Sequence, residues 1–262
     1  AGGAMVREEV EPVANDFLNR VFEDGSQGEL YRIDDEWWFT DSWSQPSLSA
    51  SWVYKGTDNP GRYRSEWMKR TRENEDDYSA LVSFFKKVSG TYTQSEIERL
   101  IDPVATMKIW AIRGYIGDWD SFSMNRGKNS YFYRRPTDGV FMFFHWDSDL
   151  AFQSGYRNSA FYNGASEGMK GIRPYIEQPY NLRLFKHFLA TLVEDYTRDS
   201  ALVSAWLQAE EDASTQYTVS TAYKNWFQSR ETPANNFLGN SRNLTFAITT
   251  NSGNTITTSG QT

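Results

Sequence analysis

Apolar residues recur every three or four positions in several stretches of the chain, which is the spacing of helices with one buried face. The predicted helices cover residues 12–23, 76–90, the stretch opened by the capping-box sequence TQSE at 93–96, 102–117, and most of 179–230. The helix over 102–117 has the clearest ends, because Asp102 is a good N-cap, Pro103 suits the first helical position and Gly117 suits the C-terminus. Its buried stripe is predicted to consist of Val104, Met107, Trp110, Ala111 and Tyr115.

Other stretches are short and apolar or alternating, as expected of strands. The predicted strands are 28–33, 49–56, 130–135 and 140–146, and the turn PTDG at 136–139 joins the last two into a hairpin. The strand over 140–146 is apolar almost throughout, so we expect it to be buried on both faces. The charged stretch 67–77 is predicted to be a solvated helix face or a loop. The threonine-rich tail from Leu244 predicts a second β-hairpin.

Together these elements predict an α+β fold that is mostly helical, with a small central β-hairpin and a trailing β segment. Strands and helices do not alternate in the way that a parallel sheet requires. We divide the chain into three parts. Residues 1–7 are expected to be a vector-derived remnant or the remnant of an N-terminal strand, 8–240 the main domain, and 241–262 a β tail or the start of a truncated β module.

Composition narrows the possible functions. The 262 residues carry a formal net charge of -7, which disfavours a nucleic-acid partner. The chain has no cysteine and only two histidines, His145 and His187. Disulfides, thiolate catalysis and a three-histidine metal site are therefore excluded. Any metal is expected to be bound by carboxylates and amides, which suits Mg²⁺, Mn²⁺ or Ca²⁺. No apolar run is long enough to predict a transmembrane helix.

Two acidic pairs flank the predicted hairpin. Asp118 and Asp120 precede it, Asn129 begins its first strand, and Asp147 and Asp149 follow its second strand in the sequence HWDSDLAF. A short hairpin returns the chain close to its origin, so we expect these side chains at one end of the hairpin. Carboxylates placed there either cap local N–H groups or hold a divalent cation.

The order of these groups is also that of a protein-kinase site. Kinases use one carboxylate to accept the proton of the acceptor hydroxyl, and an amide and a second carboxylate to hold the metal. Asp120, Asn129 and Asp147 give the matching series. Asn129 follows Asp120 by nine residues, a longer interval than in a kinase catalytic loop, and no His-Arg-Asp sequence is present.

The stretch YIGDWDSFSMNRGKNSYFYRRPTDGVFMFFHWDSDLAF resembles the core block of the spore-coat protein H (CotH) kinase family. The family block contains a Gly-Asn-Trp-Asp-Ser segment, an aromatic strand beginning with Asn, and a Trp-Asp-x-Asp-Leu-Ala-Phe segment. The likeness extends upstream through DYSALVSFFKKV, GELYRI and EPVANDFL, and so covers most of residues 8–155.

The resemblance implies an atypical kinase that uses ATP with Mg²⁺ or Mn²⁺ and transfers the γ-phosphate to Ser or Thr of a partner protein. Carried over by position, Asp120 is the catalytic carboxylate, Asn129 and Asp147 bind the metal-nucleotide, and Asp149 assists Asp147 as a metal ligand. Asp118 stands where the family often has Asn. The family also implies a secreted or cell-surface, spore-coat-associated location.

One departure concerns the phosphate-gripping lobe of the kinase fold. No glycine-rich loop followed by a strand lysine precedes the block, and Glu11 matches a family glutamate that follows that lobe. We therefore expect the protein-kinase-like C-lobe without an N-lobe, and weak activity or none from this chain alone.

Two other functions are consistent with the sequence. A non-catalytic coat, surface or adhesion protein that reuses the fold would bind no nucleotide. A metal-dependent carbohydrate-active enzyme would use Asp147 and Asp149 to hold the diphosphate of a nucleotide sugar, with Trp37 and Trp38 as sugar platforms.

Overall fold

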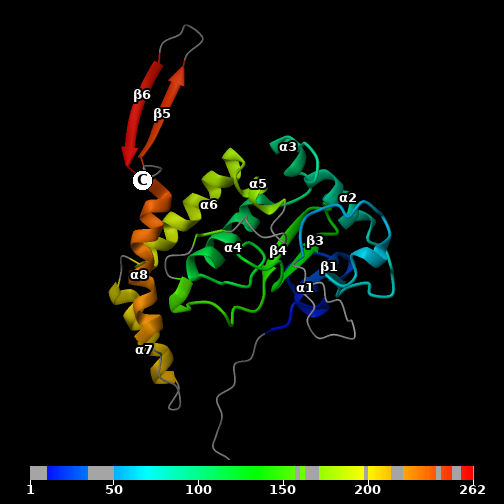
Figure 1. Ribbon diagram of the computed structural model, residues 1–262, viewed down its shortest axis with the longest axis horizontal. Helices are drawn as coiled ribbons and strands as arrows, with labels where there is room; N and C mark the ends of the chain where they lie inside the picture. The colour runs from blue at the N-terminus through cyan, green and yellow to red at the C-terminus, as the bar shows by residue number, and fades with distance from the viewer. Residues whose placement is uncertain are drawn as a thin grey trace, which may run out of the picture.

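The computed structural model describes residues 11–34, 50–156, 160–162, 171–197, 200–213, 221–239, 243–249 and 255–261. Over these residues the chain has an α+β fold of eight α-helices, a four-stranded antiparallel sheet and a separate two-stranded hairpin (Figure 1). The predicted α+β class is confirmed. The predicted Trp37 and Trp38 platform and residues 1–7 lie outside the described residues.

The central sheet is larger than the predicted hairpin. Its strands are β1 (Glu29–Ile33), β2 (Trp67–Lys69), β3 (Ser130–Arg134) and β4 (Phe141–His145), arranged in the order β2-β1-β3-β4. The predicted β3–β4 hairpin is confirmed, with Ser130 opposite His145 and Arg134 opposite Phe141. Strand β1 pairs with both β2 and β3, so contacts between distant parts of the chain complete the sheet.

Two predictions about strands were wrong. Residues 50–56 form no strand, because the N–H of Tyr54 donates to Ser89 Oγ rather than to a sheet neighbour, although Trp52 is fully buried in the core. Conversely, the charged stretch 67–77 begins with β2 instead of being wholly loop or helix.

The sheet has two unequal faces, since alternate residues of a strand point to opposite sides. The main core covers one face and includes Tyr31, Phe132 and Phe143, which are fully buried. A smaller cluster of Leu18, Leu30, Tyr131 and Tyr133 covers the other face beneath α1 (Asn15–Val21). Strand β4 is accordingly buried at Phe141 and Phe143 on the main face, half-buried on the second face and exposed at His145, so it is not buried on both faces as predicted.

Trp52 is the centre of the main aromatic core. Its indole lies 5.1–6.0 Å, centroid to centroid, from six other rings. Such contacts stabilise beyond the area that they bury, by about 0.5–1.5 kcal/mol for a pair. These neighbours come from helices, strands and loops alike and are Phe84, Trp110, Phe122, Phe132, Phe143 and Tyr175.

The helices pack around this core. In chain order after α1 they are α2 (Ser79–Val88), α3 (Gln94–Ile97), α4 (Pro103–Ile116), α5 (Ile172–Ile176), α6 (Pro179–Leu192), α7 (Ser200–Ala213) and α8 (Thr221–Leu238). A π-helical turn, Val193–Thr197, follows α6 directly. Helix α4 contacts both β4 and α6, which places it between the sheet and the C-terminal helices (Figure 1).

The ends of α4 are as the sequence predicts. The Asp102 carboxylate accepts a hydrogen bond from the N–H of Ala105 at 3.0 Å, Pro103 is the first helical residue, and Gly117 ends the helix with φ of 63°. The predicted buried stripe is confirmed except for Val104, which is 46% exposed in the first turn.

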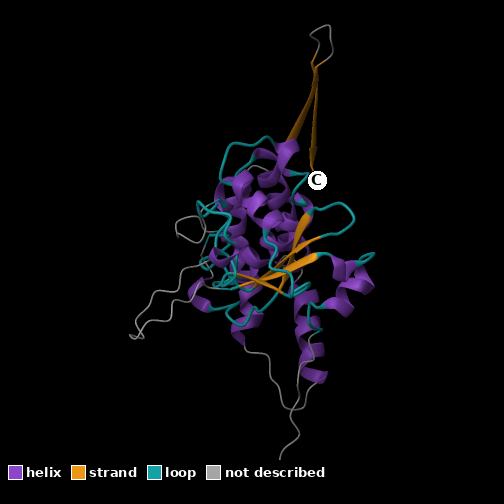
Figure 2. Cartoon of the chain, turned by 90° about the vertical axis from the view of Figure 1, so that its right-hand side faces the viewer, coloured by secondary structure: helices purple, strands orange, loops and turns teal. Residues whose placement is uncertain are grey.

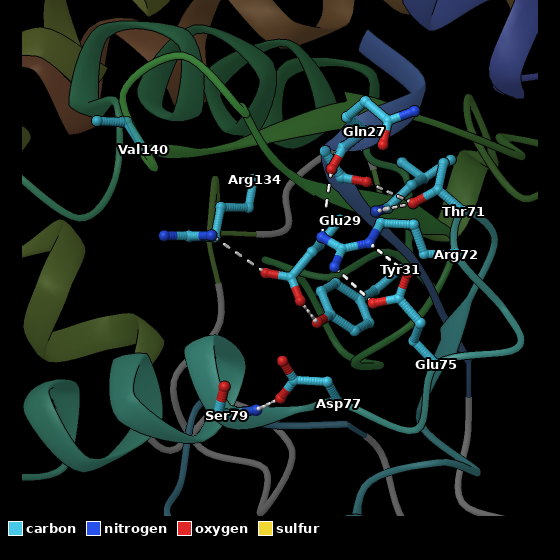
Figure 3. A network of polar contacts seen from close by, with 12 residues as sticks. Gln27, Glu29, Tyr31, Thr71, Arg72, Glu75, Asp77, Ser79, Arg134 and Val140 are labelled. Atoms are coloured by element: carbon cyan, nitrogen blue, oxygen red, sulfur yellow. Dashed lines mark hydrogen bonds and ion pairs between the residues drawn. The ribbon is translucent and has the colours of Figure 1, made fainter. Parts of the chain in front are cut away.

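A polar network crosses the sheet at the end where β1 begins (Figure 3). Glu29 is buried there and accepts from Tyr31 Oη at 3.3 Å and from Arg134 Nη1 at 3.4 Å. Thr71 ties the same strand to the loop after β2, since its hydroxyl accepts from Leu30 N and donates to Gly28 O. Because Glu29 pairs with Arg134 and not with Ser130, this network lies at the opposite end of the sheet from the acidic pairs.

The C-terminal part consists of α8 and a hairpin. Helix α8 contributes the buried Trp226 and Arg230 to the body of the molecule. Strands β5 (Asn243–Thr249) and β6 (Thr255–Gln261) pair with each other, which confirms the predicted tail hairpin, and project from the end of α8 (Figures 1 and 2). None of the helices in the described part of the chain is long and apolar enough to cross a membrane.

Candidate functional site

The candidate site lies where β3 begins and β4 ends. Ser130 is opposite His145 in the sheet, so Asn129 and Trp146 are the next residues outward at the same end. Asp147 follows immediately, and the loop holding Asp118 is tied to this end by hydrogen bonds. The sequence prediction that the hairpin returns Asn129 and Asp147 to one end is therefore confirmed.

A buried arginine on α4 joins the three segments that meet there. Arg113 is fully buried, and each of its five N–H donors has an acceptor. Nε donates to Asp118 Oδ2 at 2.7 Å, Nη1 donates to Asn129 O and to Ser130 Oγ at 2.7 Å, and Nη2 donates to Trp146 O at 2.7 Å and Asp147 O at 2.9 Å.

Asp118 is the anionic partner of this arginine. Its carboxylate is fully buried, and Oδ2 also accepts from Ser148 Oγ at 2.7 Å. Burial raises the pKa of Asp118, while Arg113 and Ser148 act in the opposite direction by stabilising the carboxylate. The Asp118 carboxylate is therefore held in place by its ion pair with Arg113.

Asp120, two residues further on, has a different environment. Its Oδ2 forms an ion pair with Lys128 Nζ at 2.9 Å, and its side chain is 5% exposed against 25% for the lysine. Three buried polar atoms near this point have no hydrogen-bond partner in the part of the chain that the structure describes. They are Asp118 Oδ1, Asp120 Oδ1 and Asn129 Nδ2. Such atoms are costly to bury unless a ligand, an ion or water engages them.

Asp147 and Asp149 are exposed at the exit of β4. The N–H of Asp149 lies 3.4 Å from Asp147 Oδ1, a long contact. The pKa of Asp149 is raised, first by desolvation of its carboxyl and then by the negative charges of Asp147 and Asp120, while Lys128 acts in the opposite direction. These four charged groups therefore lie within electrostatic reach of one another.

Two of the predicted ligand residues have left-handed backbones. The φ angle is 58° at Asn129 and 52° at Asp147. Asn and Asp tolerate this region better than other residues with a side chain, at a cost of about 1–2 kcal/mol. At both positions the carbonyl oxygen is an acceptor of Arg113.

The donor chemistry fits a divalent metal bound with a nucleotide. Mg²⁺ in kinase sites is held by one or two carboxylates together with substrate phosphates, and it retains several waters. Asp147, Asp149 and Asn129 supply carboxylate and amide oxygens of this kind. Over the described residues, no group of three or more His, Cys, Asp or Glu side chains is gathered closely enough to hold a metal ion by itself.

The two histidines differ in their relation to the site. His145 Nε2 lies 3.1 Å from Ser148 Oγ, so His145 belongs to the network around Asp118. Although the residue is exposed overall, desolvation of its ring and the Arg113 cation lower its pKa, and the imidazole is neutral at pH 7. His187 is on the exposed face of α6, away from these contacts, with its ring 5.4 Å from that of Phe188.

Sequence reasoning missed Arg113 and Lys128. The available signal for Arg113 was a cation inside the apolar sequence MKIWAIRGYIG, where an unpaired charge is unfavourable. Lys128 had no local signal, because its partner Asp120 is eight residues earlier in an irregular loop.

The fold and site define an α+β protein with carboxylates and an amide collected at one end of its sheet. A family model described as CotH kinase protein matches residues 8–213. The chain therefore belongs to the CotH kinase protein family. No curated protein matches the chain significantly.

Proposed function

We propose that this chain is the catalytic part of an atypical protein kinase that transfers the γ-phosphate of ATP to Ser or Thr of a partner protein. Two findings support the proposal. The chain belongs to a family of kinases, and Asp120, Asn129 and Asp147 come from three separate segments that Arg113 and the β3–β4 pairing hold together. The convergence at the sheet end is the observation that carries it.

The proposed roles follow from the environments of these residues. Asp120 accepts the proton of the acceptor hydroxyl, since its Oδ1 has no partner among the described residues. Asp147 is exposed and is the principal metal ligand, with Asn129 as the amide ligand and Asp149 beside it. Mg²⁺ or Mn²⁺ bound there would neutralise the charge on the phosphates.

The transfer breaks the bond between the γ-phosphorus and the bridging oxygen of ADP and forms one to the acceptor oxygen. The hydroxyl proton passes to Asp120, so atoms and charge balance. Lys128 is more exposed than Asp120 and covers Oδ2 as an ion pair.

The described residues are proposed to correspond to the C-lobe of a kinase fold, within a domain over 8–240. We also propose a secreted or coat-associated location for the protein, and an acceptor on a partner protein at that location.

The test is a thermal-shift titration with ATP, with Mg²⁺ or Mn²⁺, and with both, alongside a nucleotide sugar. A ligand that binds only the native state stabilises it by mass action and so raises the melting midpoint. At a ligand concentration of one hundred times the dissociation constant, the stabilisation is about 2.7 kcal/mol. We expect a shift that requires both ATP and metal, and Asp147→Asn is expected to abolish it. A radiolabelled transfer assay with Ser- and Thr-containing proteins then tests the chemistry.

Asp24→Asn is the matched control, because Asp24 is also left-handed, with φ of 50°, and lies far from the site in sequence. It is expected to keep the full shift. A shift with the nucleotide sugar alone would favour the carbohydrate-active function. No shift with any nucleotide would favour a non-catalytic coat or adhesion protein.

A further inference from the structure

We infer that Arg113 is a positioning residue of the proposed phosphotransfer site, which fixes the backbone from which Asn129 and Asp147 project. This inference rests on the proposed function for its catalytic meaning. Its structural part concerns the ligand-free protein alone and is tested separately below.

The first observation is the distribution of the five hydrogen bonds. A buried arginine that served only as the counter-ion of Asp118 would be expected to direct two donors to that carboxylate, as bidentate pairs do. Here Asp118 takes one donor of the five. The other four reach Asn129 and Ser130 at the start of β3 and Trp146 and Asp147 after β4.

The second observation is which atoms accept these four hydrogen bonds. Two of the acceptors are the carbonyl oxygens of Asn129 and Asp147, the two left-handed residues of the site. A backbone held in a sparsely populated region persists only when its surroundings determine it. The planar guanidinium supplies donors in fixed directions to both turns at once, and so couples the orientations of the two proposed ligand residues.

A lysine at position 113 could not supply the same hydrogen bonds. An ammonium has three donors around one point, whereas the guanidinium has five donors in a rigid fork. Arg113→Lys therefore keeps the positive charge beside Asp118 and leaves at least two of the five acceptors without the hydrogen bond that Arg113 donates. Charge and geometry are separated by this one substitution.

Arg230 offers a matched control in the same molecule. It is also fully buried and also donates to backbone carbonyls, those of Gly114, Tyr115 and Tyr156. None of these acceptors is a residue of the candidate site. Arg230→Lys thus removes comparable hydrogen bonds from the same core without touching the turns at Asn129 and Asp147.

The experiment compares wild type, Arg113→Lys and Arg230→Lys by two measurements. Amide hydrogen exchange of the ligand-free proteins is expected to accelerate over 128–131 and 146–149 in Arg113→Lys only. Affinity for Mn²⁺-ATP is expected to fall by at least about tenfold in Arg113→Lys, the usual effect of removing a residue that orients metal ligands. Both variants are expected to lose thermal stability, so stability alone does not discriminate.

Equal exchange at the two turns in Arg113→Lys and Arg230→Lys would overturn the inference. If wild type binds no Mn²⁺-ATP, the proposed function fails, and exchange alone still decides whether Arg113 holds the turns. Should Arg113→Lys fail to fold, Ser130→Ala removes one acceptor of the same set. It is then expected to accelerate exchange over 128–131, and unchanged exchange there would contradict the inference.

Discussion

At the scale of single residues, the charged groups at the end of β4 shift the protonation of Asp149. Asp149 is exposed, yet the pKa of its carboxyl is raised by desolvation and by Asp147 and Asp120. A raised pKa means that a proton competes with a metal ion for this carboxylate up to a higher pH than usual. The metal binding proposed for this site is therefore expected to strengthen as pH rises through the pKa of Asp149.

Replacing Asp147 by Asn is predicted to lower the pKa of Asp149. The substitution removes one negative charge and keeps a side chain that tolerates the left-handed backbone at this position. The pKa is expected to remain above its ordinary value, because desolvation and Asp120 still act on it. An NMR titration of the side-chain carboxyl carbons measures the change directly.

Asp138→Asn is the control for this titration. Asp138 is in the turn at the far end of the β3–β4 hairpin and pairs with Arg135 there. Its removal is expected to leave the pKa of Asp149 unchanged. An equal decrease in both variants would show that the effect is general and that Asp147 and Asp149 are not electrostatically coupled.

At the scale of secondary-structure elements, local signals could be read from the sequence and distant pairings could not. The ends of α4 were predictable because Asp102, Pro103 and Gly117 act within one turn of the helix. Strand β2 could not be predicted, because its three residues become a strand only by pairing with β1 about thirty-six residues away.

The same reasoning applies to the candidate site. Asp120, Asn129, Asp147 and Asp149 were identified because they adjoin elements that the sequence predicts. The contribution of Arg113 was not identified, since its acceptors extend from Asp118 to Asp147 and depend on how β3 and β4 pack against α4. The role of a buried cation follows from its tertiary partners.

Helix α4 provides a prediction in which packing opposes helix propensity. Gly114→Ala would ordinarily stabilise a helix interior by about 1 kcal/mol. Here an added Cβ would lie 2.0 Å from the carbonyl oxygen of Phe161. Because a backbone atom is in the way, we expect a net loss of about 1–3 kcal/mol, measured by urea unfolding.

Gly90→Ala is the comparison for Gly114→Ala. The nearest atoms to a Cβ at Gly90 are at 3.6 Å, an ordinary contact distance. Its effect on the free energy of unfolding is expected to be within about 0.5 kcal/mol. If Gly114→Ala were as stable as Gly90→Ala, the result would contradict the close packing of α4 against residue 161.

At the scale of the whole molecule, the core extends beyond the region that defines the family. The family match ends at residue 213, yet α8 inserts Trp226 and Arg230 into the core, where both are fully buried. Trp226 Nε1 and Arg230 Nε both donate to the carbonyl oxygen of Tyr115, in the last turn of α4. Helix α8 therefore supports the helix that carries Arg113.

Two truncations are predicted to differ strongly in their effect on stability. Ending the chain after Gly239 removes β5 and β6, which pair only with each other in the described structure, so the melting temperature is expected to change by less than about 2 °C. Ending it after Ala213 removes α8. Loss of a buried Trp side chain alone costs about 3–5 kcal/mol, a large part of the roughly 5–15 kcal/mol that stabilises a typical domain.

We therefore expect the chain ending at Gly239 to melt cooperatively and to give the same ATP and metal response as the full chain. The chain ending at Ala213 is expected to lose cooperative unfolding in calorimetry. The contrast is one of stability, because α8 buries Trp226 and Arg230 against the last turn of α4. A chain ending at Ala213 that still melted cooperatively would show that the region matched by the family model folds independently, and that α8 is an addition to a complete core.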